Sequence, residues 1–114
     1  MYYSPPEISV QELAQKITEQ SELVQLIDVR EPQETDYAAL PGFVVLPLSQ
    51  FPQWRETITT RFNPDLETIV LCHHGIRSAQ MCQWLQEQGF IQVANVSGGI
   101  DAYSRMVDRS IPRY

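Results

Sequence analysis

Basic residues are scarce in this chain of 114 residues: 8 lysines and arginines stand against 14 aspartates and glutamates, which gives a net charge of −6. A protein that binds nucleic acid needs clustered Lys and Arg side chains to neutralise the phosphate backbone. The composition therefore argues against nucleic acid as a partner. It still allows a small anionic substrate, provided that one site is locally positive.

Long apolar runs and cysteines are also few. No stretch approaches the roughly 20 apolar residues of a membrane span, so we expect no membrane partner. The first six residues lack the basic and apolar regions of a secretory signal, and we expect a cytoplasmic location. The chain contains 2 cysteines, at positions 72 and 82, which make neither a disulfide framework nor a paired-cysteine zinc motif. We therefore expect a single domain, residues 1–114, that folds without a metal or cofactor.

Apolar stretches of strand length alternate along the chain with stretches of helical periodicity. Buried strands are predicted for the apolar runs at residues 23–29, 43–46, 68–71 and 91–96. Helices are predicted to start at the capping box of residues 9–12, at residues 31–34, at Ser49 (through 58, with Pro52 in its first turn), at Arg77 (ending before Gly89) and at residues 97–99. This alternation indicates an α/β domain with a mostly parallel sheet.

Cys72 directly follows the most apolar predicted strand and precedes the helix over residues 77–88. In a parallel sheet, ligands bind beyond the carboxyl ends of the strands. Gly75 lets the backbone curl so that several N–H groups point at one spot, and the start of the helix favours an anion there. Arg77 adds a permanent positive charge and a planar set of donors. These features favour the thiolate of Cys72, a nucleophile that can form a covalent intermediate.

The neighbouring Cys and His residues leave alternatives open. His73 and His74 are candidates for acid–base groups or metal ligands, but adjacent loop histidines are more often solvated. Cys82 repeats with other apolar residues at helical spacing and is predicted to belong to the core. The set Cys72, His73 and Cys82 does not supply clean tetrahedral ligation, so we predict no metal site.

Arg77 has an alternative role as well. Its guanidinium can stabilise an anion at Cys72 or bind an anionic donor. It can instead form a structural salt bridge with Asp28 or Glu31, which follow the first long predicted strand.

Three ordered segments resemble the signatures of the rhodanese-like domain family: residues 27–31 (IDVRE), residues 72–78 (CHHGIRS) and residues 97–100 (SGGI). The resemblance covers nearly the whole chain. It implies a five-stranded, mostly parallel sheet flanked by helices on both faces. It also implies that Cys72 is the nucleophile that accepts sulfur, and that the persulfide lies in a cradle formed by His73, His74, Gly75, Ile76 and Arg77.

Two positions depart from the family pattern. The family often has His before the Pro-Gly turn, where this chain has Leu40, and Trp in the last helix, where this chain has Tyr103. Asp28 and Arg30 match family positions that brace the fold near the site. Because both departures lie outside the cysteine loop, the chemistry implied for Cys72 is unaffected.

The resemblance implies a sulfurtransferase that takes a sulfane sulfur from thiosulfate or from a protein or low-molecular-weight persulfide. Cys72 passes the sulfur to a thiol or to cyanide, and a sulfur-relay protein is a further expected partner. One alternative is a non-catalytic binding module, although such family members commonly lack the cysteine. Another is a Cys-based phosphatase or arsenate reductase, but that pattern has five residues between Cys and Arg, and here there are four.

Overall fold

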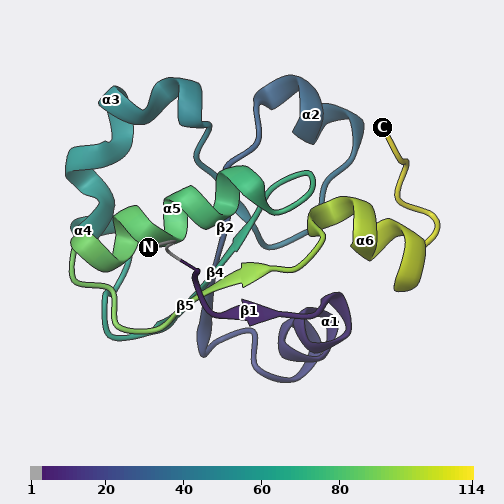
Figure 1. Cartoon of the computed structure of the whole chain (residues 1–114), viewed down its shortest axis with the longest axis horizontal. Helices are drawn as coiled ribbons and strands as arrows, with labels where there is room; N and C mark the ends of the chain where they lie inside the picture. Colours follow the sequence, from purple (N-terminus) through teal and green to yellow (C-terminus); the bar gives the residue numbers. More distant parts are fainter. Residues whose placement is uncertain (1–3) are drawn as a thin grey trace.

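The computed structural model describes residues 4–114, which form a parallel β-sheet covered by helices (Figure 1). The five strands are β1 (Glu7–Ile8), β2 (Val24–Asp28), β3 (Val44–Val45), β4 (Glu67–Leu71) and β5 (Val93–Val96). All neighbouring pairs run parallel, in the order β1-β5-β4-β2-β3. The five-stranded α/β architecture expected from the sequence is confirmed.

The helices begin and end largely where local signals indicate. They are α1 (Val10–Glu19), α2 (Pro32–Tyr37), α3 (Phe51–Trp54), α4 (Ile58–Arg61), α5 (Ile76–Glu87) and α6 (Gly99–Met106). The predicted capping box precedes α1: the Glu12 N–H donates to Ser9 Oγ over 3.0 Å, and the Ser9 N–H donates to Glu12 Oε1 over 3.1 Å. Gly89 follows α5 with φ 98°, the conformation that stops a helix.

The helix predicted from Ser49 through residue 58 is confirmed only in part: the segment is helical, but it is not one continuous helix. The segment consists of the 3₁₀ turn η1 (Leu48–Gln50), α3, a second turn η2 (Arg55–Thr57) and α4. Pro52 lies in the first turn of α3, as predicted, and it has no N–H with which to continue a helix from η1. Ser49 lies inside η1 and caps no helix, because its side chain bonds to Glu31 instead.

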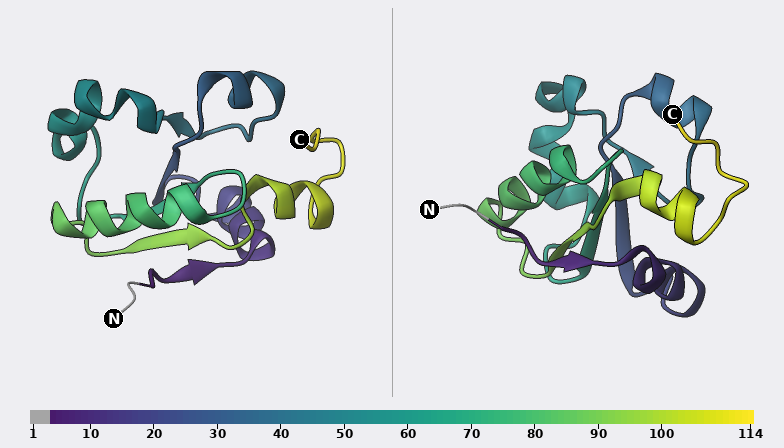
Figure 2. Two further views of the ribbon diagram at one scale, coloured as in Figure 1. Left: turned by 45° about the horizontal axis from the view of Figure 1, so that its top comes forward. Right: turned by 45° about the vertical axis from the view of Figure 1, so that its right-hand side comes forward.

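Helices cover both faces of the sheet, as expected, and each face has its own apolar core (Figure 2). Ile69 and Leu71 of β4 belong to the core that includes α1 and α6. Val70 and Cys72 belong to the core that includes α3, α4 and α5. This alternation follows from the two-residue period of a strand. It places the Cys72 side chain at the carboxyl end of the sheet, on the face covered by α5.

Candidate active site

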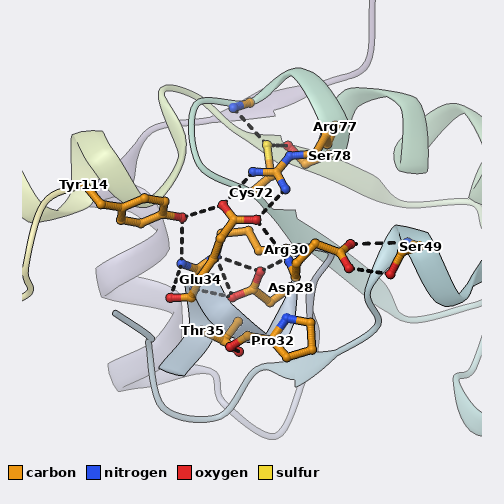
Figure 3. Close-up of polar contacts among 12 residues, drawn as sticks. Asp28, Arg30, Pro32, Glu34, Thr35, Ser49, Cys72, Arg77, Ser78 and Tyr114 are labelled. Carbon is orange, nitrogen blue, oxygen red and sulfur yellow. Dashed lines mark hydrogen bonds and ion pairs between the residues drawn. The ribbon is translucent and has the colours of Figure 1, made fainter. Parts of the chain in front are cut away.

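The loop after β4 wraps around the sulfur of Cys72 (Figure 3). The Gly75 N–H donates to Cys72 Sγ over 3.0 Å, and Gly75 has φ 109°, which favours glycine. Gly75 is also the residue from which α5 starts. The sequence predicted that several N–H groups point at one spot; among the described residues, one backbone donor, the Gly75 N–H, bonds to the sulfur.

The start of α6 holds the other side of this loop. The N–H groups of Ile100 and Asp101 donate to the carbonyls of Cys72 and His73 over 3.0 and 3.2 Å. Gly99 has φ 62°, and a Cβ atom there would lie 2.6 Å from the Cys72 carbonyl oxygen. The close approach of the two backbones therefore requires glycine at position 99.

Two buried polar side chains, Ser78 and Asn95, form a chain of hydrogen bonds that starts at the Cys72 sulfur. Sequence reasoning did not identify either of them as a site residue. Ser78 Oγ, on the first turn of α5, lies 3.1 Å from Cys72 Sγ, and it also bonds to Asn95 Oδ1. Asn95 pairs in register with Val70 of β4, and the two-residue period of the strand places it on the same side of the sheet as Cys72. The available signal was a single polar residue within the otherwise apolar strand β5.

Arg77 is bound by Glu34 on α2 (Figure 3). Arg77 Nη1 lies 2.6 Å from Glu34 Oε1, and Nη2 lies 2.9 Å from Oε2. The bond from Arg77 lowers the pKa of Glu34 to about 2, and the same bond raises the pKa of Arg77 above its ordinary value. Both groups are therefore charged at neutral pH, and the positive charge of Arg77 is paired.

The alternative salt bridge that the sequence suggested for Arg77 named the wrong partners. Asp28 is occupied by Arg30, whose Nη2 lies 2.7 Å from Asp28 Oδ2, and both side chains are buried. Glu31 accepts hydrogen bonds from the backbone and side chain of Ser49. Glu34 was missed because it lies 43 positions before Arg77, and only the packing of α2 brings the two together.

His73 lies between two other rings. Its ring stacks on Tyr114 with centroids 3.9 Å apart and on His74 with centroids 3.8 Å apart. Burial lowers the pKa of His73, with a further contribution from His74, so the imidazole is neutral at neutral pH. The hydroxyl of Tyr114 donates to Glu34 over 2.8 Å, so Tyr114 joins His73 to the Arg77–Glu34 pair. Sequence reasoning assigned Tyr114 no role in the site.

His73, His74 and Asp101 bring donor atoms within 4.8 Å of one another. The two imidazole rings pack on each other, with centroids 3.8 Å apart and planes tilted by 32°. The Asp101 carboxylate is bound by both Arg105 and Arg113 over 3.1 Å. These residues do not fit a metal, and we assign none to them.

The second cysteine, Cys82, lies inside the core on α5. It is 0% exposed, and burial, together with the nearby Cys72, raises the pKa of its thiol to about 12. Cys82 therefore stays protonated and inaccessible, in keeping with the core position that its spacing predicted.

A hollow of about 260 Å³ opens at the loop. It is lined by Cys72, His73, His74, Ile76 and Arg77, and Ile76 is 74% exposed at the surface. The hollow thus gathers five of the six residues that the sequence nominated, and the sixth, Gly75, bonds to the sulfur. A larger hollow of about 670 Å³ beside the end of α6 is lined by residues 104–106, 109 and 111–113 and contains no nucleophilic thiol.

A curled loop at the carboxyl end of a five-stranded parallel sheet, closed around one cysteine, is the architecture of the rhodanese-like domain. The model of that family matches residues 9–106, and the chain belongs to the family.

Its relatives include proteins named for sulfur transfer. It is 52% identical over 110 residues to the "Rhodanese-like/PpiC domain-containing protein 12, chloroplastic" of Arabidopsis thaliana, covering 95% of this chain and 37% of that protein. It is 33% identical over 99 residues to the protein named "Sulfurtransferase" of Allochromatium vinosum, covering 87% of this chain and 88% of that one. The crystal structure of a rhodanese-like domain protein from Staphylococcus aureus is similar with a TM-score of 0.75 at 28% identity, covering 96% of this chain and 98% of that chain.

Among the helices of residues 4–114, we find none that combines the length and apolar character needed to cross a membrane.

Proposed function

We propose that this chain is a sulfurtransferase that carries sulfur as a persulfide on Cys72. The observation that carries the proposal is the position of Cys72: its Sγ accepts the Gly75 N–H within the curled loop, and the residue lines the hollow. A donor N–H and the start of a helix stabilise a thiolate or persulfide anion. Relatives named as sulfurtransferases support the same class of reaction.

The proposed reaction has two displacement steps. The Cys72 thiolate attacks the outer sulfur of thiosulfate, the S–S bond of the donor breaks, and sulfite leaves with the bonding electron pair. The persulfide then meets a thiolate or cyanide, which attacks its terminal sulfur. The acceptor leaves as a persulfide or as thiocyanate, and the Cys72 thiolate returns.

The charge at the hollow bears on the choice of donor. Thiosulfate is a dianion, and Arg77 is the cationic residue that lines the hollow. Because Glu34 pairs with both terminal nitrogens of Arg77, the hollow offers a dianion little net positive charge. We infer that a persulfide donor, on a protein or on a small thiol, suits this site better than thiosulfate, and that thiosulfate is a working but weak donor.

The extent and location of the functional unit are part of the proposal. We propose that residues 1–114 act as one catalytic domain, since the family match spans residues 9–106. The cytoplasmic location stays a prediction; one relative is named as chloroplastic. Cell fractionation with an antibody against the protein checks it.

Intact mass spectrometry tests the proposed reaction. Incubation with thiosulfate or a small-molecule persulfide should add the mass of one sulfur atom, and cyanide should remove it. Cys72→Ser should abolish the gain, whereas the control Cys82→Ser should retain it, because Cys82 is buried and protonated. Sulfur loading of the Cys72→Ser protein would refute the proposal. Turnover of p-nitrophenyl phosphate that depends on Cys72 would favour the phosphatase alternative instead.

A further inference from the structure

The hydroxyl of Ser78 lies between two groups that compete for its single proton. On one side is Cys72 Sγ at 3.1 Å, and on the other is Asn95 Oδ1. A serine hydroxyl has one proton to donate and lone pairs with which to accept. Because Cys72, Ser78 and Asn95 are buried at 1%, 0% and 2% exposure, each polar atom depends on its partners here.

The orientation of the Asn95 amide settles which way the proton points. Its Nδ2 faces two acceptors, the Gly75 carbonyl at 2.9 Å and Glu7 Oε2 at 3.3 Å. The NH₂ group must therefore be on that side, and Oδ1 must face Ser78. An amide oxygen only accepts, so the Ser78 hydroxyl donates to Asn95 and presents its lone pairs to Cys72.

A hydroxyl lone pair that faces Sγ can accept a hydrogen bond from the protonated thiol. The same lone pair repels the negative charge of the thiolate. With Cys72 protonated, its S–H donates to Ser78 Oγ and every group is satisfied. When Cys72 ionises and releases its proton to water, Ser78 must rotate to donate to the sulfur. Asn95 Oδ1 is then left buried without a donor, which costs free energy.

We propose that Asn95 is a positioning residue that holds the Ser78 proton and thereby opposes ionisation of the unloaded Cys72, against the stabilising effect of the Gly75 N–H. The significance for catalysis rests on the proposed function of Cys72; the effect on the thiol itself does not. Asn95 thus limits the fraction of Cys72 that is present as the reactive thiolate.

Other charged and titratable groups surround Cys72 and are not substituted in the Asn95 variant, although Asn95→Ala removes the hydrogen bond to Glu7. The groups on the loop, on α5 and α6, on α2 and on the edge strand β1 are His73, His74, Arg77, Cys82, Asp101, Glu34 and Glu7. Within residues 4–114, none of these groups forms a hydrogen bond with Ser78 Oγ. The Ser78 hydroxyl therefore responds directly only to Asn95 and Cys72.

The test is the pH dependence of Cys72 alkylation by iodoacetamide. Asn95→Ala frees Ser78 to donate to the thiolate, so the midpoint of the alkylation curve should move to lower pH by about one unit, a tenfold gain in thiolate. Thr68→Ala, which removes a fully buried hydroxyl from β4, is the matched control and should leave the midpoint in place. An unchanged or higher midpoint in a folded Asn95→Ala protein would overturn the proposal.

A double-mutant cycle separates this role from a purely structural one. Asn95→Ala also deprives the Gly75 carbonyl of its donor, which could disturb the loop. In a Ser78→Ala background the proton competition is absent, so adding Asn95→Ala should produce no shift to lower pH. The same downward shift in that background would mean that Asn95 acts through the loop, and the proposal would fail.

A second measurement needs no change at Asn95. In Cys82→Ala, Cys72 is the only thiol of the chain, so the infrared S–H stretching band comes from Cys72. Because this S–H donates to Ser78, the band should lie at lower frequency than in the double variant Cys82→Ala/Ser78→Ala. Equal frequencies would overturn the proposal even if Asn95 variants failed to fold. If the alkylation midpoint shifts as stated but no variant transfers sulfur, the proposed function fails and the assignment of Asn95 stands.

Discussion

Arg77 and Glu34 are joined by two parallel bonds, Nη1 to Oε1 over 2.6 Å and Nη2 to Oε2 over 2.9 Å. The pair ties the first turn of α5 to α2, on the edge of the hollow that Cys72 lines. Tyr114 adds a third bond to the same carboxylate. The charge available to an incoming donor is therefore set by Glu34 as much as by Arg77.

Glu34→Gln should improve the use of thiosulfate. Removing the carboxylate charge leaves Arg77 as a net cation at the hollow, and a dianionic donor gains from it. We expect kcat/KM for thiosulfate to rise roughly three- to tenfold, and kcat/KM for a small persulfide, which carries less negative charge than the dianion, to rise less. Steady-state kinetics with both donors check this.

The matched control for that variant is Glu31→Gln. It removes the same charge three positions earlier, but from a side chain that bonds Ser49 and has no contact with Arg77. A rise of equal size in the control would assign the effect to the net charge of the molecule. Unchanged thiosulfate kinetics in Glu34→Gln would show that Arg77 does not meet the donor.

Arg77→Ala should have the opposite effect on thiosulfate. It leaves the Glu34 carboxylate unpaired beside the hollow, where it repels an anion. We expect thiosulfate-dependent kcat/KM to fall about ten- to a thousand-fold, the range for loss of a charged contact. Arg77→Lys should recover part of it, because a point charge does not replace two parallel bonds. Wild-type kinetics with reduced thermal stability would instead assign Arg77 a structural role only.

The Arg77–Glu34 pair should make part of the stability depend on acidic pH. The pKa of Glu34 is about 2 in the folded chain, below its ordinary value of 4.5, so its contribution is complete above about 4.5. The contribution is lost as the pH falls from 4.5 through 2. The difference in free energy of unfolding between wild type and Glu34→Gln should therefore shrink over that range. Urea denaturation at a series of pH values measures it.

Arg77→Ala provides the check on the cause of this pH dependence. The hydrogen bond from Arg77 makes the largest contribution to the lowered pKa of the Glu34 carboxyl. The stability difference between wild type and Arg77→Ala should shrink over the same range. A difference that is constant from pH 6 to pH 2 in both variants would contradict the assignment.

Two glycines with positive φ should respond very differently to substitution by alanine. Gly99 has φ 62°, and an added Cβ would lie 2.6 Å from the Cys72 carbonyl oxygen, so the loop and α6 must separate. Gly89 has φ 98° and no atom within 4 Å of the added Cβ. We expect Gly89→Ala to cost about 1–2 kcal/mol, the cost of the backbone conformation, and Gly99→Ala about 3 kcal/mol or more.

Chemical denaturation and the alkylation rate of Cys72 measure these effects. Gly99→Ala should also change the alkylation rate, because the Cys72 and His73 carbonyls lose their fixed partners. Gly89→Ala should leave that rate unchanged. Equal losses of stability in the two variants would show that the contact between α6 and the loop contributes little.

Local features of this protein were determined by the sequence alone. The capping box of Ser9 and Glu12 and the helix stop at Gly89 involve groups within one turn of the chain, so their physical effect does not depend on the fold. Cys72 and Gly75 are likewise three residues apart, and a curled loop brings them together. The parallel sheet followed from the alternation of strands and helices.

The local sequence pattern was insufficient to predict secondary structure where an element is short or where a distant residue binds a side chain that was expected to cap a helix. The two-residue strand β1 has no periodicity to detect, and it exists because it pairs with β5, more than 80 residues later. The predicted helix from Ser49 divided because Pro52 lacks an N–H and because Glu31, 18 residues away, took the serine side chain. In both cases a distant partner decided the local structure.

The polar surroundings of Cys72 were decided by tertiary structure. Glu34 reaches Arg77 only because α2 packs beside the start of α5, and Asn95 reaches Ser78 only because β5 lies next to β4 in the sheet order. Sequence reasoning predicts Cys72 as the nucleophile together with its loop, since these residues are contiguous in the chain. The partner of Arg77, Glu34, and the acceptor of the Ser78 proton, Asn95, depend on helix packing and strand order. The reason is that a hydrogen bond requires two atoms within about 3 Å, whatever their separation along the chain.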